Sequence, residues 1–111
     1  MNNVILVGRL TKDPEIQEGE SGKKRTFITL AVNRSYKNAE GIYECDFIPC
    51  LVWDGVAENL AKYYKKGDTL AIKGRIQQNQ IEKENGTKES KLIIIVERIT
   101  LLNPKKETTE E

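Results

Sequence analysis

The chain has 111 residues, of which 38% are hydrophobic, and its 18 basic and 17 acidic residues leave a formal net charge of +1. This length suits one domain with a modest core, and the mean hydropathy of −0.56 is typical of a soluble globular protein. The near-neutral balance excludes a polycation that binds nucleic acid through total charge alone, but it does not exclude a local basic stripe. The longest apolar run, Leu92 to Val96, is too short to cross a bilayer. No basic-then-apolar leader precedes the first apolar run, so we expect a cytoplasmic protein.

Several kinds of catalytic and metal site are missing from the sequence. It contains no histidine, which excludes a histidine general base and a histidine metal ligand. Gly22-Lys23 does not complete a phosphate-binding-loop motif. We interpret the acidic side chains of the first polar stretch as a solvated loop rather than a cation site; they are Asp13, Glu15, Glu18 and Glu20. We predict neither an enzyme nor a cofactor or metal site.

Hydrophobic periodicity predicts five strands and one helix. The strands are expected at Asn3 to Leu10, Arg25 to Arg34, Tyr43 to Trp53, Thr69 to Gln80 and Glu89 to Leu102. The helix follows the third strand, with Asp54 as its N-cap, apolar residues at helical spacing from Ala57, and Gly67 as its C-terminal stop. We interpret Tyr63 and Tyr64 as packing residues of this helix.

The order of three strands, a helix and two strands suits an all-β fold. It is typical of a five-stranded oligonucleotide-binding (OB) barrel with one helix between strands 3 and 4. Asn85-Gly86 is the strongest short hairpin signal of the sequence, and its charged flanks predict an arm that extends into solvent. We place the domain at residues 1–104 and expect a short disordered tail at residues 105–111.

The third predicted strand has the most informative pattern. Tyr43, Phe47 and Trp53 are all odd-numbered, so they project to the same side of a strand. The other side receives an apolar set for a core, namely Ile48, Cys50 and Val52. Displayed rings form a platform on which unpaired bases stack. The alternative is that the rings themselves belong to the core, and this strand alone does not decide between the two.

The two cysteines also lie in this strand. Cys45 and Cys50 are five residues apart and face opposite sides, too far apart in an extended strand for a disulfide between them. We interpret both as reduced, buried thiols of an intracellular protein.

Two apolar runs predict a homo-oligomer. Val4 to Val7 and Leu92 to Val96 are apolar on both faces, whereas a small antiparallel barrel has only one interior face. The outer residues therefore need a cover, and an interface between copies of the chain would supply it.

Several motifs in order resemble one known family. They are Asn3-Val4-Ile5-Leu6-Val7-Gly8-Arg9-Leu10-Thr11-Lys12-Asp13-Pro14-Glu15, Thr29-Leu30-Ala31-Val32-Asn33-Arg34-Ser35-Tyr36, Asp46-Phe47-Ile48-Pro49-Cys50-Leu51-Val52-Trp53, Ala57-Glu58-Asn59 and Lys65-Lys66-Gly67-Asp68. Together they resemble the single-stranded DNA-binding proteins of bacteria and bacteriophages over residues 2–104.

The resemblance implies an OB fold, usually a homotetramer, that coats single-stranded DNA with little sequence preference during replication, recombination or repair. It implies a cytoplasmic, nucleoid-associated protein. By position, it assigns base stacking to Tyr36, Phe47 and Trp53, and it gives no such support to Tyr43. Each stacked base would contribute about 1–3 kcal/mol.

The sequence departs from the family in the predicted arm. Ile81 stands where many members carry a further stacking aromatic, and an isoleucine can press on a base without offering a π-face. Positions that are often basic in relatives are here Pro49, Gln77, Asn79 and Gln80. Phosphate contacts would then fall to Arg34, Lys37, Lys73, Arg75, Lys83 and Lys88. Fewer cations predict a shallow salt dependence.

The end of the sequence departs as well. Family members usually end in an acidic-hydrophobic tip that recruits replication and repair proteins, but this sequence stops at Glu107-Thr108-Thr109-Glu110-Glu111. Recruitment through such a tip is therefore not expected, whether the chain is a naturally short form or a truncated one. Two alternatives stay open: a module that binds RNA or both nucleic acids, and an oligomeric protein-interaction paralogue with weakened DNA binding.

Overall fold

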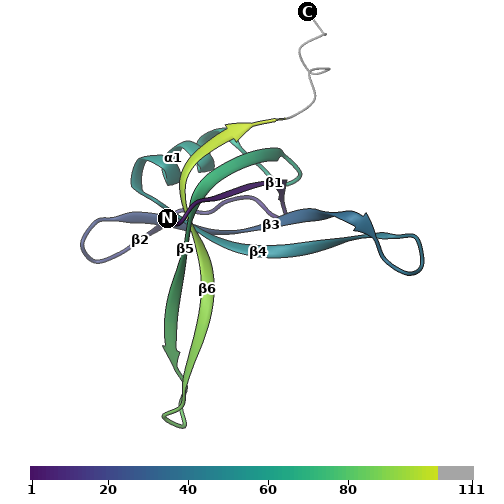
Figure 1. The fold of residues 1–111 in the computed structure, drawn as a ribbon. Helices are drawn as coiled ribbons and strands as arrows, with labels where there is room; N and C mark the ends of the chain where they lie inside the picture. Colours follow the sequence, from purple (N-terminus) through teal and green to yellow (C-terminus); the bar gives the residue numbers. More distant parts are fainter. Residues whose placement is uncertain (103–111) are drawn as a thin grey trace, which may run out of the picture.

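The computed structural model describes residues 1–102, which form six strands and one helix (Figure 1). The strands are β1 (Val4–Leu10), β2 (Gln17–Glu18), β3 (Lys24–Lys37), β4 (Tyr43–Trp53), β5 (Thr69–Glu82) and β6 (Lys88–Leu101), and helix α1 (Asp54–Tyr63) lies between β4 and β5. β4 has its predicted bounds, and the other four long strands end within three residues of theirs. The two-residue β2 was not predicted, and the expected tail lies outside the described residues.

The five long strands close into a barrel. β1 pairs with both β3 and β5, β3 pairs with β4, and β5 pairs with β6, all antiparallel. A short parallel pairing of β4 with β6, from Cys50–Ile94 to Val52–Val96, completes the circuit. This confirms the predicted all-β, five-stranded barrel with its helix between the third and fourth long strands.

The even-numbered residues of β3, β4 and β5 fill the barrel, as strand alternation requires. The most deeply buried strand residues are Leu10, Ile28, Leu30, Cys50, Val52, Leu70 and Ile72, each at most 3% exposed. Helix α1 adds Ala57 and Leu60, which are both fully buried. Burying one such aliphatic side chain contributes about 1.5–3 kcal/mol. Cys50 therefore belongs to the core, and burial raises the pKa of its thiol to about 12.

The helix differs from its prediction at both ends. Trp53, not Asp54, is the N-cap residue, and Asp54 begins the helix with a positive φ of 52°. At the other end the chain becomes extended at Tyr64, whose side chain packs on the core. Gly67 (φ 91°) therefore does not stop the helix; its N–H donates to the carbonyl oxygen of Leu10 at 2.9 Å. The segment after α1 is shaped by its attachment to the end of β1.

Two β-hairpins project from the barrel as arms (Figure 1). The predicted hairpin at Asn85-Gly86 joins β5 to β6, and the amide of Gly86 donates to the carbonyl of Lys83 at 2.9 Å. Gly86 has a φ of 85°, a left-handed conformation that glycine adopts without a steric penalty. The hairpin between β3 and β4 has the same turn, in which Gly41 donates to Asn38. The predicted β5–β6 arm is therefore confirmed, and the β3–β4 hairpin forms a second arm.

β5 and β6 carry a bulge where the arm leaves the barrel. Lys73 pairs with Arg98 but Gly74 pairs with Val96, so Glu97 is the extra residue of β6. At this point the two backbones approach so closely that a Cβ on Gly74 would lie 2.1 Å from the carbonyl oxygen of Ile95. Only glycine fits the bulge without moving the backbone.

We predict that Gly74→Ala lowers the free energy of unfolding by about 1–3 kcal/mol, because the new methyl group overpacks a site bounded by backbone. Urea unfolding followed by circular dichroism measures the change. Gly55→Ala is the matched control: a Cβ on Gly55 meets nothing within 4 Å, and alanine should stabilise α1 by about 0.5 kcal/mol. Equal stability of the two variants would contradict the close approach at Gly74.

Candidate nucleic-acid interface

The register of β3 and β4 defines one outer face of the barrel. Directly opposite residues of an antiparallel pair share a face, and Arg25 lies opposite Trp53, Phe27 opposite Leu51, and Ala31 opposite Phe47. The odd-numbered residues from 25 to 33 and from 45 to 53 therefore point outward together. We call this surface the ring face.

Aromatic side chains are displayed on the ring face. Phe47 is 65% exposed, Phe27 is 45% exposed and Trp53 is half-buried. The core is filled from the other side of the same strands, so the open question about β4 is resolved in favour of display. The prediction that Phe47 and Trp53 share an outward face is confirmed.

Two tyrosines lie further along the β3–β4 arm. Tyr43 is 55% exposed, and the ammonium group of Lys37 lies 5.6 Å from the centre of its ring. Tyr36 is 63% exposed and belongs to the irregular stretch where β3 has three residues opposite Glu44 alone. Of the three rings that the family resemblance selected, Tyr36 and Phe47 are more exposed than Tyr43, and Trp53 is less exposed.

A groove of about 510 Å³ runs between the ring face and the β5–β6 arm. Phe27 and Pro49 line it from the strands of the ring face, and Ile81, 46% exposed, lines it from β5. The remaining lining residues also come from the arm; they are Gln78, Asn79, Gln80, Lys91, Leu92 and Ile93. The structure thus brings Ile81 to the same groove as an exposed ring.

Arg34 lies on the side of the β3–β4 arm that faces away from the ring face. Its guanidinium forms a bidentate contact with Asp46, at 2.9 and 3.2 Å, and a further bond to Glu44 at 2.8 Å. Both acids are even-numbered residues of β4, so they face away from Phe47. The ion pair raises the pKa of Arg34 and lowers the pKa of the Asp46 carboxyl. Two carboxylates compete with any phosphate for this arginine.

Most of the other predicted cations also have carboxylate neighbours. Lys73 and Arg75 both contact Glu97, at 3.4 and 3.3 Å, and Lys83 contacts Glu89 at 3.3 Å. Exposed pairs of this kind are weak and screened by salt, so they lower the local positive potential without locking the side chains. Of the predicted set, Lys37 and Lys88 have no ion pair within the part of the chain that the structure describes.

Sequence reasoning missed two residues of the ring face, Phe27 and Arg25. The guanidinium carbon of Arg25 lies 5.4 Å from the centre of the Phe27 ring and 5.9 Å from that of Trp53. The odd parity of Phe27 within β3 was a usable signal for its direction. The proximity of Arg25 to Trp53 depends on the register between β3 and β4, which one strand's pattern does not contain.

The cysteines divide between the two faces, as their parity predicted. Cys45 is only half-buried, however, and its thiol donates to Oδ1 of Asn33 at 2.8 Å. The interpretation of both thiols as buried is therefore right for Cys50 and wrong for Cys45. Both are free in the structure.

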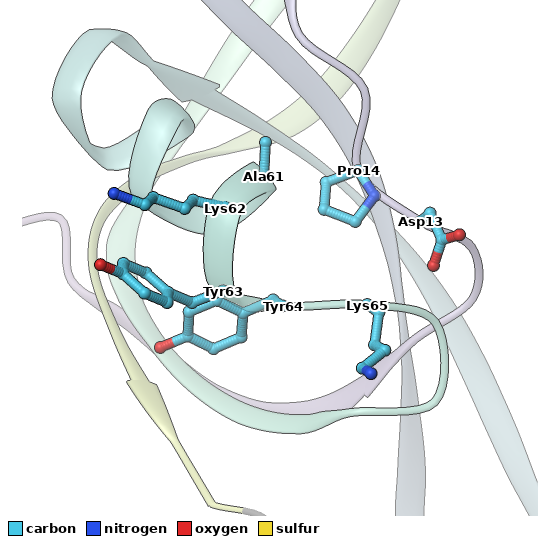
Figure 2. A pocket seen from close by; sticks show the side chains of 7 residues that line it. All are labelled: Asp13, Pro14, Ala61, Lys62, Tyr63, Tyr64 and Lys65. Atoms are coloured by element: carbon cyan, nitrogen blue, oxygen red, sulfur yellow. The ribbon is translucent and has the colours of Figure 1, made fainter.

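A second hollow lies at the C-terminal end of α1 (Figure 2). Asp13 and Pro14 enter it from the loop after β1, and Tyr63 and Tyr64 enter it from the helix end. Asp13 accepts a hydrogen bond from the amide of Lys66 at 2.7 Å, so this side chain joins two loops of the fold. Tyr63 is 62% exposed, and the prediction that it packs in the helix interface is wrong, whereas Tyr64 does pack on the core.

Residues 1–102 contain neither a cluster of metal-ligating side chains nor a membrane-spanning helix. No three His, Cys, Asp or Glu side chains are grouped so that they could hold a metal ion. No helix in this part of the chain has both the length and the apolar character needed to cross a membrane.

A closed five-stranded barrel with a helix between its third and fourth long strands defines an OB fold. The exposed rings on its surface are suited to stacking the bases of single-stranded nucleic acid. Residues 1–102 match the model of the single-strand binding protein family. The chain belongs to this family, as the motifs of its sequence indicated.

Similar proteins have closely related names, and the chain spans between 66% and 92% of the length of three of them. The chain is 41% identical over 104 residues to single-stranded DNA-binding protein B of Bacillus subtilis, a match that covers 94% of this chain and 92% of that protein. It is 44% identical over 105 residues to single-stranded DNA-binding protein 3 of Listeria innocua, covering 95% and 66% respectively. It is 43% identical over 106 residues to single-stranded DNA-binding protein 1 of Lactococcus lactis, covering 96% and 71%.

Proposed function

We propose that this chain binds single-stranded DNA with little sequence preference and coats it during replication, recombination or repair, without catalysing a reaction. The observation that carries the proposal is the row of exposed rings on the ring face of an OB barrel. Stacking tolerates any sequence because every base has a π-face. Relatives that match over nearly the whole chain are named for single-stranded DNA binding, which supports the same function here. We place this role in residues 1–104, in the cytoplasm and in association with the nucleoid.

The proposal assigns base stacking to Tyr36, Phe47 and Trp53, with Ile81 pressing on a base from the opposite wall of the groove. The exposure of these side chains supports the assignment, and Ile81 lines a groove whose other wall includes Phe27 and Pro49 of the ring face. Phosphate contacts are assigned to Lys37, Lys73, Arg75, Lys83 and Lys88. The carboxylates around Arg34 favour a role in holding the β3–β4 arm over a phosphate contact.

Trp53 provides a direct test, because it is the single tryptophan of the chain. We expect oligo-dT to quench its fluorescence at low salt, since a base stacked on the indole changes its surroundings. A titration that leaves the fluorescence unchanged at low salt would favour the protein-interaction alternative. Competition between oligo-dT and oligo-U then decides between DNA binding and binding of both nucleic acids, because only RNA offers a 2′-hydroxyl.

Phe47→Ala should weaken binding of a fluorescently labelled oligo-dT by about 5- to 150-fold, since one base–ring stack contributes about 1–3 kcal/mol. Trp53→Ala should act in the same direction. Fluorescence anisotropy measures the affinity, and sedimentation should show an unchanged oligomeric state. Tyr63→Ala, which removes an equally exposed ring from α1, is the control and should bind as the unmodified protein does. Unchanged affinity in both ring-face variants would remove the stacking assignment.

We also propose that the chain is a homo-oligomer, and specifically a homotetramer. Ile5 and Val7 on β1 are 72% and 50% exposed, and Leu92 on β6 is 63% exposed. Exposed apolar side chains on strands favour association between copies. Part of the sequence argument was wrong, however: of the two outward residues within Leu92 to Val96, Ile93 is half-buried and Ile95 is only 6% exposed, because the rest of the chain covers them. The proposal therefore rests on β1 and Leu92.

Sedimentation velocity at micromolar concentration tests the oligomer. We expect the unmodified protein to sediment as an oligomer and the double variant Ile5→Lys/Val7→Lys to dissociate, because an interface that buries two new charges loses stability. Tyr63→Lys adds a charge at an equally exposed position on α1 and should leave the association unchanged. A stable monomer of the unmodified chain would end the proposal.

A further inference from the structure

Arg25 occupies a special position on the ring face. It lies opposite Trp53 in the register and two residues before Phe27 on the same side of β3. Its guanidinium carbon is within 5.4 Å of one ring centre and 5.9 Å of the other. A group in flat contact with a ring would lie about 3.5–4 Å away. The guanidinium therefore lies near both rings without flat contact with either, and Phe27 remains 45% exposed.

Arg25, like Lys37 and Lys88, differs from most cations near the proposed DNA path in having no carboxylate partner among the described residues. Five of those cations have a carboxylate partner: Lys24, Arg34, Lys73, Arg75 and Lys83. Arg25 has none among residues 1–102, and its contacts there are with the two rings. Its Nε–H is buried and donates to nothing. A buried donor without an acceptor costs free energy, and a ligand would remove this cost once the side chain moved to expose the Nε–H.

The chemistry of the site indicates which ligand would do so. A guanidinium presents its N–H groups as a planar fork that matches two oxygens of a phosphate. If two nucleotides stack on Phe27 and Trp53, the phosphate that links them passes between the two rings, which is where the fork lies. A carboxylate of the protein would compete for the same place, and the ring face offers none to Arg25.

We propose that Arg25 binds the phosphate joining two nucleotides whose bases stack on Phe27 and Trp53. The proposal rests on the proposed function, and it adds Phe27 as a further stacking ring. It also makes Arg25 a principal cation of the interface, because four of the six predicted cations are already opposed by carboxylates.

The alternative role for Arg25 is support of the two rings without contact with DNA. Arg25→Met separates the roles, because methionine keeps an unbranched apolar stem beside the rings but carries neither charge nor N–H donors. We expect this variant to bind labelled oligo-dT about tenfold or more weakly at low salt. The slope of log affinity against log salt concentration should become shallower by about 0.7, the value for one phosphate contact on a single strand. The fluorescence of Trp53 in the free variant should show whether the ring has moved.

Lys62→Met is the matched control. Lys62 also lies over an exposed ring, 5.3 Å from the centre of Tyr63, but on α1 and outside the ring face. Both variants lose one positive charge, Arg25→Met with two cation–ring contacts and Lys62→Met with one, and only Arg25→Met should change the salt slope. Arg25→Lys should keep the slope and bind more weakly than the unmodified protein, because an ammonium cannot form the fork.

Three results bear on the proposal in different ways. An unchanged slope in Arg25→Met, at any affinity, would overturn the phosphate contact and leave only ring support. Equal changes in Arg25→Met and Lys62→Met would also overturn it, since the effect would then be one of net charge. Failure of the unmodified protein to bind oligo-dT would contradict the proposed function itself, and is therefore distinguishable from both.

Discussion

The fold depends on one short contact, the parallel pairing of β4 with β6 over three residue pairs. Every other strand pairing of the barrel is antiparallel, and without this contact the sheet would have two free edges. Closure gives the sheet an inside, and the two-residue period of a strand then assigns each side chain to the core or to the surface. Cys50 and Val52 are inside for this reason, and Phe47 is outside. The ring face is thus a direct result of closing the barrel.

Much of this was accessible from the sequence. Strand alternation and the Asn85-Gly86 turn located five strands and one arm, because these signals are local. The ends of α1 were missed because tertiary contacts set them: Asp54 adopts a left-handed conformation at the strand–helix junction, and Gly67 bonds to Leu10 rather than stopping the helix. β2 has only two residues and no alternation to detect. The site was located in part, because parity gives the direction of Phe47 but only register places Arg25 beside Trp53.

The electrostatic character of the molecule is local rather than global. Counting lysines and arginines overestimates the positive surface, since Glu97 alone contacts two of the predicted cations and Asp46 and Glu44 share Arg34. A chain with a net charge of +1 can still present an anion-binding point where one cation has no acidic neighbour. On the ring face, that condition is met by Arg25, which lies near the rings of Phe27 and Trp53.

The bulge at Glu97 has a consequence for how the chain tolerates changes in length. On the arm side of the bulge the inward residues of β6 are even-numbered, as for Ile94 and Val96, and on the far side they are odd-numbered, as for Ile99. The one extra residue therefore shifts the alternation of β6, so that the inward side chains change from even-numbered to odd-numbered residues. Deleting Glu97 would turn the side chains of residues 98–101 of β6 to the opposite face of the sheet. It would also release Lys73 and Arg75 from their shared carboxylate. A deletion or insertion at this point of β6 should therefore destabilise the barrel more than a substitution does, whereas a change of the arm length by matched pairs of residues keeps the alternation of both strands.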